Sequence, residues 1–191
     1  MADKSVLISI RPRWASLILS GEKTLELRRT RPNLKPPFKC YIYCTKVRKP
    51  WVRADVPGIR QDGYVVADFI CDNITRLTHV GFSSDYKPPI PVAVRDKCRL
   101  EPIMDFDGGR SCLTLGEIDR YLDGGDGFAW HISKLEIYDT PKKLTEFRAW
   151  KKCKSCSKSG YESTACIYDD NCMVPVAITK APQNWCYVEV P

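Results

Sequence analysis

The sequence lacks several features that would assign a protein to a class directly. It has no run of about 18 or more apolar residues, so a transmembrane helix is not predicted and we expect no membrane association. The first residues, MADKSVLISIRPRW, lack the long apolar segment of a secretory signal, which leads us to expect a cytoplasmic protein. Internal repeats, a nucleophile elbow, a phosphate-binding loop and an HExxH motif are also missing.

Histidine is scarce as well. The chain has only two histidines, His79 and His131, and they lie far apart in the sequence. A single histidine on a strand, as expected for His131, usually finds its partners within the fold. We therefore do not predict a nucleophilic site that depends on histidine.

Acidic residues are few in the first third of the chain. Residues 1–60 contain 14 lysines and arginines against 4 acidic residues, whereas residues 61–191 contain 16 against 19. Phosphate neutralisation supplies much of the affinity of proteins for nucleic acids, so this asymmetry is typical of a face that binds a polyanion. A basic surface that is merely solvated is the alternative.

The size and the hydrophobic periodicity predict one domain, residues 1–191, with many strands and few helices. An apolar run at 5–10 is typical of a strand, and residues 11–21 have the spacing of an amphipathic helix. A second helix is predicted at 113–125, where Thr114 and Glu117 are spaced as a capping box. Further strands are predicted at 38–46, 63–77, 128–144 and 185–190, and the long one at 63–77 is expected to be bent.

This pattern favours an α+β, mostly β, barrel-like fold with two or three helices, because a parallel βαβ array would need more regular alternation. Residues 81–110 are rich in proline and are expected to form an irregular loop, and residues 48–62 fit no regular element. Three tryptophans in periodic elements are expected in the core: Trp14, Trp130 and Trp185.

The segment SGEKTLELRR, residues 20–29, concentrates charge directly after the first predicted helix. From Thr24 the pattern alternates, so that Leu25 and Leu27 face a core while Thr24, Glu26 and Arg28 share the other face of a strand. Lysine and arginine contact phosphate, and a carboxylate between them fixes their geometry. The spacing indicates either a polar binding site or a structural network of salt bridges.

The segment GEKTLELR resembles the G-x-K-x-x-E-x-R signature of the ASCH domain family, a member of the PUA-like superfamily, with Gly21, Lys23, Glu26 and Arg28 at the four fixed positions. The residues before it, those at 112–147 and those at 181–190 also resemble the family. The resemblance implies a PUA-like pseudo-β-barrel with two or three helices packed around a cleft. It implies binding of RNA, another nucleic acid or a modified nucleoside. The site residues would be Lys23, Thr24, Glu26, Arg28 and Arg29, joined by Trp51 and Arg53 of a basic loop, with Trp51 as a stacking platform.

Some ASCH proteins resemble amidohydrolases that act on N4-acetylcytidine, and this implies an alternative in which Lys23, Thr24 and Glu26 are catalytic; a nuclease is a further alternative. Lys23 matches the lysine of that branch, but Glu26 stands where the branch has threonine. No obvious match exists for the branch's distant glutamate, because only Asp107 lies near the aligned position and Asp105 and Glu101 would need the loop to fold back. The sequence therefore favours a binding domain over an enzyme.

Ten cysteines in a chain without an export signal indicate reduced thiols, some of which bind metal. An insertion at 151–175 carries four of them at C-x2-C-x9-C-x5-C spacing, and its first pair has the spacing of a zinc knuckle. The expected ligands of one structural zinc ion are Cys153, Cys156, Cys166 and Cys172. Free thiols or a disulfide are the alternative for this insertion, and Cys40 and Cys44, four apart on a strand, are expected in the core.

Overall fold

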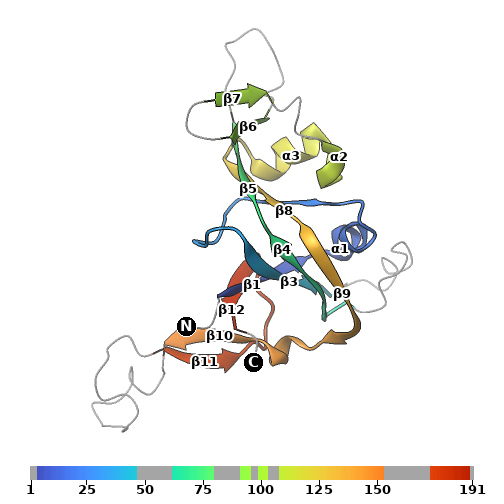
Figure 1. The fold of residues 1–191 in the computed structure, drawn as a ribbon, viewed down its shortest axis with the longest axis vertical. Coiled ribbons are helices and arrows are strands. Elements are labelled where there is room, and N and C mark those ends of the chain that lie inside the picture. Colours follow the sequence, from blue (N-terminus) through green and yellow to red (C-terminus); the bar gives the residue numbers. More distant parts are fainter. Residues whose placement is uncertain are drawn as a thin grey trace.

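The structure is a computed structural model that describes residues 4–46, 62–79, 91–95, 99–102, 108–152 and 173–189 (Figure 1). Within these residues the strands form two five-stranded sheets and one two-stranded sheet. The predicted mostly β fold of the α+β class is confirmed. The two large sheets do not close into a barrel in the described part of the chain.

The first sheet has the strand order β12-β1-β3-β4-β9. Its strands β1 and β3 are parallel and its other neighbours are antiparallel. The parallel pair is possible because a helix follows β1 and carries the chain back before β3 begins. The bounds are β1 (Ser5–Ile10), β3 (Phe38–Cys44), β4 (Val65–Cys71), β9 (Ser133–Lys142) and β12 (Trp185–Val188).

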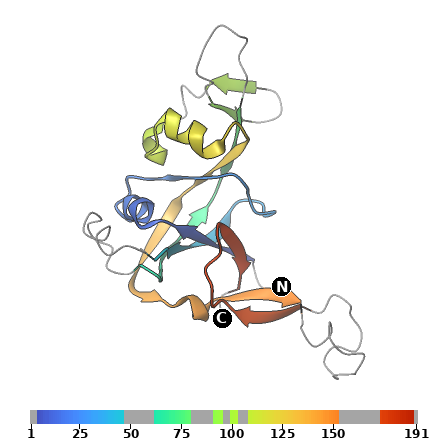
Figure 2. The same cartoon turned by 180° about the vertical axis from the view of Figure 1, so that it is seen from behind.

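The second sheet has the order β2-β8-β5-β6-β7 and is antiparallel throughout. Its bounds are β2 (Leu25–Arg28), β5 (Ile74–His79), β6 (Pro91–Arg95), β7 (Arg99–Pro102) and β8 (Gly127–His131). The third sheet is a ribbon of two antiparallel strands, β10 (Arg148–Lys152) and β11 (Met173–Ala177). This ribbon lies at the opposite end of the molecule from β6 and β7 (Figures 1 and 2).

Two long strands of the sequence prediction are each divided between the large sheets. The strand predicted at 63–77 breaks at Asp72 and Asn73 into β4 and β5, and the strand predicted at 128–144 breaks at Ile132 into β8 and β9. At both breaks the backbone stays hydrogen-bonded, with His131 N donating to Asn73 O and Ile132 N donating to Thr24 O, each at 2.9 Å. The chain therefore passes from one sheet to the other without a loop that the sequence pattern would reveal.

The segment predicted as an irregular loop at 81–110 is in part regular, which corrects that prediction. Within it, β6 and β7 pair with each other and extend the second sheet from β5. The two prolines of this segment that the structure describes occupy tolerated positions, since Pro91 is the first residue of β6 and Pro102 the last of β7, the edge strand. Proline content was therefore a poor sign of irregular structure here.

The helices begin and end where the sequence places them. The first, α1 (Pro12–Leu19), starts on its proline and is followed by Gly21, whose φ of +80° favours glycine. The helix α3 (Leu115–Leu122) has the predicted capping box, with Glu117 N donating to Thr114 Oγ1 at 3.3 Å and Thr114 N to Glu117 Oε2 at 2.9 Å. Two short helices complete the described set, α2 (Gly108–Ser111) and the 3-10 helix η3 (Leu144–Glu146).

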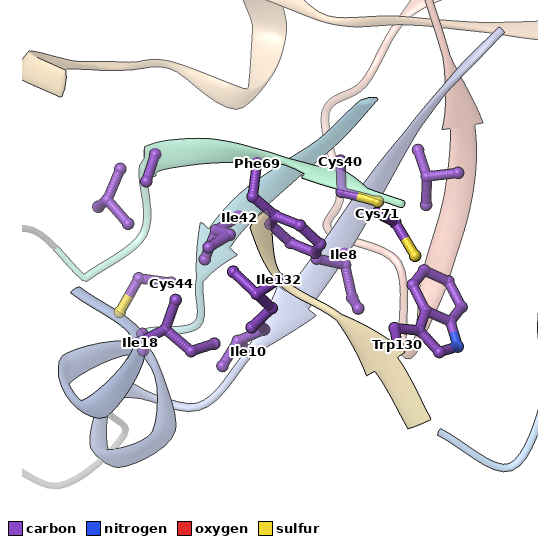
Figure 3. Close-up of a cluster of buried hydrophobic side chains, with 14 of the residues drawn as sticks. Ile8, Ile10, Ile18, Cys40, Ile42, Cys44, Phe69, Cys71, Trp130 and Ile132 are labelled. Carbon is purple, nitrogen blue, oxygen red and sulfur yellow. The ribbon is translucent and has the colours of Figure 1, made fainter. Parts of the chain in front are cut away.

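Alternation along β1 and β3 directs apolar side chains into two cores, one on each face of the first sheet. The first core gathers side chains from β1, β3, β4, α1 and the β8–β9 break, and Figure 3 shows them converging. The predicted core positions of Cys40 and Cys44 are confirmed, because both are fully buried there. The second core includes Tyr41, Tyr43 and Phe147. No helix in the described ranges is long and apolar enough to cross a membrane.

Candidate functional site

The motif SGEKTLELRR connects α1 to β2. Lys23 N donates to Leu17 O at 2.8 Å, which folds the turn after α1 back on the helix. Leu25 and Leu27 pack with Ile118 and Leu122 of α3 in a third apolar cluster. The predicted inward direction of the two leucines is thus confirmed, and α3 is the element that covers them.

Lys23 is buried, with only 2% of its surface exposed. Its ammonium group lies 2.7 Å from Leu25 O, 2.7 Å from Ser111 O and 3.3 Å from Glu26 Oε2. A lysine has three donor hydrogens, and these three acceptors match that number. Lys23 therefore ties β2 to the end of α2 and has no donor left over for a ligand.

Glu26 joins Lys23 to Arg28. The second carboxylate oxygen of Glu26, Oε1, lies 3.0 Å from Nη2 of Arg28. Arg28 Nη2 also donates to Ser9 O at 2.8 Å, and Nη1 donates to Asn184 Oδ1 at 2.9 Å. We call Lys23, Glu26 and Arg28 the buried charge network; it carries one net positive charge.

Of the two alternatives predicted for the polar face of β2, a binding site and a structural network of salt bridges, the burial fits the second, since Glu26 and Arg28 are 7% and 8% exposed. Both faces of the strand are covered. Cross-strand pairing places Glu26 directly opposite Trp130 on β8, and the segment that precedes β12 lies over Arg28 through Asn184. The charges are therefore enclosed in the protein and stabilised by one another and by backbone carbonyls.

A hollow nevertheless adjoins the network. A cavity of about 1100 Å³ lies beside β2, between α1, α3 and residues 181–184. We call it the basic cleft. Its charged lining consists of five cationic side chains and two carboxylates: Arg11, Lys23, Arg28, Arg29, Arg120, Glu26 and Glu117. Hydrogen bonds from Thr114 hold the pKa of the Glu117 carboxyl below its ordinary value, so this group stays negatively charged. The five cations nevertheless outnumber the two carboxylates, and the lining is positive on balance.

Two aromatic rings line the basic cleft from opposite walls. Trp14 of α1 is half-buried, and the ammonium nitrogen of Lys23 lies 5.5 Å from the centre of its ring. Tyr121 of α3 is 38% exposed, and the guanidinium carbon of Arg29 lies 5.5 Å from its ring centre. Arg29 Nε also donates to Tyr121 O at 2.7 Å. The cleft therefore combines exposed guanidinium groups with flat apolar surfaces.

The structure brings Lys23, Glu26, Arg28 and Arg29 together at the basic cleft. Thr24 does not line the cleft. Its hydroxyl accepts a hydrogen bond from Arg110 Nε at 3.0 Å. The remaining predicted residues lie outside the described residues: Trp51, Arg53, Cys153, Cys156, Cys166 and Cys172. In the ranges that the structure describes, no group of three or more His, Cys, Asp or Glu residues is placed to hold a metal ion.

Sequence reasoning missed four contributors to the cleft. Arg11 and Arg120 gave no signal beyond their charge, and Tyr121 looked like one exposed residue of an amphipathic helix. Asn184 gave no signal at all, although it anchors residues 181–184 by accepting from Arg28 and donating to Thr30 Oγ1 at 3.0 Å. Of the three tryptophans assigned to the core, Trp130 is fully buried, whereas Trp185 is half-buried and Trp14 lines the cleft.

The strand histidine finds a partner within the fold, as predicted, and it does not line the basic cleft. His131 Nδ1 lies 2.5 Å from Asp72 Oδ1, and the pair connects the two breaks at which the chain changes sheets. Burial disfavours the charge of Asp72, but hydrogen bonds from His131 and Ser133 outweigh it and hold the pKa of the carboxyl below its ordinary value. The His131–Asp72 pair is therefore interpreted as part of the fold and not of the basic cleft.

The comparisons with known proteins found solved structures alone, since no family model and no curated protein matches the chain. ASCH from Zymomonas mobilis has a TM-score of 0.47 at 18% identity over 73% of each chain. A tyrosine-to-phenylalanine variant of that protein scores 0.48 at 18% identity, over 73% of this chain and 76% of that one. A serine-to-alanine variant scores 0.49 at 20% identity, over 75% and 78%. All three are structures of an ASCH protein, and ASCH is the family that the motif resembles. At 18–20% identity they say nothing of what this chain binds.

Proposed function

We propose that this chain is an ASCH-type, PUA-like domain that binds RNA as an unpaired strand in the basic cleft. The observation that carries the proposal is the cleft itself, in which five cations and two aromatic rings line a hollow beside the motif. Exposed arginines supply phosphate contacts, and aromatic faces stack on unpaired bases of any sequence. RNA follows from the family resemblance.

The residues of the cleft divide into a frame and a contact surface. The buried charge network is the frame, because Lys23 and Arg28 direct their hydrogen bonds into the protein. The contact surface consists of Arg11, Arg29 and Arg120, which are exposed, together with the two rings. Lys23 was predicted to neutralise a phosphate. In this proposal it instead positions the wall of the cleft that follows Ser111, through its hydrogen bond to Ser111 O.

The proposal predicts that Arg11→Ala combined with Arg120→Ala weakens binding of a 12-nucleotide single-stranded RNA by about tenfold or more, because hydrogen bonds to charged groups are among the stronger polar contacts. The salt dependence should fall too, since each lost phosphate contact lowers the slope of log K against log salt by roughly 0.7–0.9. Fluorescence anisotropy at several salt concentrations measures both quantities, and DNA of the same sequence serves as the comparison ligand.

The matched control is Arg76→Ala, which removes an exposed arginine that is paired with Asp126 and lies outside the cleft. It should leave both the affinity and the salt slope unchanged. An unchanged slope in the double variant, or an equal loss in the control, would contradict the assignment of the cleft.

The geometry does not favour the amidohydrolase alternative. Attack by Lys23 on a substrate would require its nitrogen to leave three acceptors within 3.3 Å. Asp107 and Asp105 lie outside the described residues, and so does the side chain of Glu101. Release of cytidine from N4-acetylcytidine by the purified protein would favour the hydrolase instead.

The zinc site stays a prediction, because all four cysteines lie outside the described residues. Four thiolates at that spacing should hold about one tetrahedral zinc ion per chain. Elemental analysis of protein prepared without chelator measures the ratio, and a variant with Cys153 and Cys156 replaced by serine should lose the metal. Metal-free parent protein with titratable thiols in this segment would contradict the prediction.

A further inference from the structure

The β10–β11 ribbon exposes a tryptophan that has no role in the cleft. Trp150 is 43% exposed and stands directly opposite Pro175 in the register of the ribbon. Met173, two residues before Pro175 on β11, is also 43% exposed. Large apolar side chains that are grouped and exposed mark surfaces that bind something.

The two faces of the ribbon differ in their contact with the core, although Val176, which pairs with Ala149, is also 38% exposed. Ala149 points toward the second core and packs against it, so its neighbours Arg148 and Trp150 point outward. Side chains of directly paired residues share a face, which puts Pro175 and Ala177 beside Trp150 and Arg148 on the outer side. All four of these residues are exposed. The outer face is thus a flat apolar surface with a guanidinium group at one end.

The charge of the ribbon indicates the chemistry of its partner. The strands RAWKK and MVPVA contain three cations and no carboxylate, and Arg148 is the described cation that shares the outer face with Trp150. Outside the two strands, the backbone of Glu189 bridges to that of Arg148. An aromatic platform next to cations suits the bases and phosphates of a single-stranded nucleic acid, because each base has a face that stacks and each linkage carries a negative charge.

The chain runs from the ribbon to the wall of the basic cleft within a few residues. Ala181, the first cleft residue after β11, follows Pro175 by six positions, a separation of at most about 22 Å even for fully extended chain. Crossing the ribbon from Pro175 to Trp150 adds about 5 Å. At the stacked spacing of roughly 3.4 Å per nucleotide, about eight nucleotides cover this distance. Figure 2 shows the chain rising from β11 toward β12 and β2.

We propose that the outer face of the β10–β11 ribbon is a second contact site for the same single-stranded nucleic acid, with Trp150 stacking on a base and Arg148 binding a phosphate. This inference rests on the proposed function of the cleft, since the strand that fills the cleft continues onto the ribbon. Two linked contacts raise the affinity for long strands without changing the affinity for short ones.

The test compares the full-length parent with Trp150→Ala on RNA strands of 4 and 12 nucleotides. Trp150→Ala is expected to weaken binding of the 12-nucleotide strand at least about fivefold, the lower bound for losing one stacked base, and to leave the 4-nucleotide strand unaffected. Trp150→Phe keeps an aromatic face and should retain most of the affinity. Arg148→Gln should lower the salt slope by roughly 0.7 with the long strand only.

Equal binding of the long strand by the parent and by Trp150→Ala would overturn the ribbon site. So would a loss of self-association in Trp150→Ala with unchanged RNA binding, because the face would then join copies of the chain. Failure of the proposed cleft site would appear separately, because the variant lacking Arg11 and Arg120 would then bind RNA with the affinity of the parent. A parent that binds neither strand would overturn both proposals.

Discussion

Replacing Glu26 by glutamine is expected to lower the free energy of unfolding by about 3–5 kcal/mol, the range measured when one partner of a buried ion pair is removed. Glu26 is the only carboxylate in the buried charge network, so its loss leaves the ammonium of Lys23 and the guanidinium of Arg28 enclosed without an opposite charge. Glutamine has nearly the same shape, and the effect therefore reports charge. Urea denaturation followed by circular dichroism measures it.

Two further variants separate charge from packing. Lys23→Met leaves the Glu26–Arg28 pair neutral, so it should lower the free energy of unfolding by less, about 1–3 kcal/mol. This loss arises because two backbone carbonyl oxygens lose their hydrogen-bond donor. Glu22→Gln alters an exposed carboxylate of the same turn, bonded to Ser20 Oγ at 2.8 Å, and should change stability by less than about 0.5 kcal/mol. If Lys23→Met proved costlier than Glu26→Gln, the network would be held by its hydrogen bonds to the backbone and not by charge balance.

The burial of this network shows the limit of local sequence patterns. Spacing alone predicted that Glu26 and Arg28 share a face, because they are two apart on a strand, and it placed Lys23 beside them in the preceding turn. Whether that face is open depends on what covers it. The covering groups, Trp130 and Asn184, lie more than about 100 positions away in the sequence, and single-sequence periodicity carries no information about them.

The same limit explains the two divided strands. Residues that favour strands continue on both sides of Asp72 and of Ile132, so each stretch looks like one strand although the chain changes sheets. Only the partners differ on the two sides of each break: Ile70 pairs with β9 and Ile74 with β8. Pairing partners are a property of the whole fold, which periodicity cannot supply.

Two predictions that needed only neighbouring residues were confirmed. The capping box of α3 depends on Thr114 and Glu117, three positions apart, and it forms as expected. The inward direction of Cys40 and Cys44 follows from their spacing of four on β3. Burial raises the pKa of the Cys44 thiol to about 12, which keeps it protonated and unreactive in the core at neutral pH.

The position of Trp130 makes it the side chain on which the cleft frame and the first core both depend. Its indole is fully buried, with Phe38 at 6.0 Å and Trp185 at 6.1 Å between ring centres. It also stands opposite Glu26 on the same face of the second sheet. A residue that supports both regions should show a large effect when it is truncated.

Trp130→Ala is expected to lower the free energy of unfolding by about 3–5 kcal/mol, because a fully buried indole leaves a cavity that its neighbours fill only in part. In the described part of the chain its Nε1 has no hydrogen-bond partner, so the loss comes from packing. Trp150→Ala is the matched control: the same atoms are removed from a residue that is 43% exposed, and we expect a cost below about 1 kcal/mol. Equal costs for the two variants, measured by urea denaturation, would mean that Trp130 does not hold the core as its burial indicates.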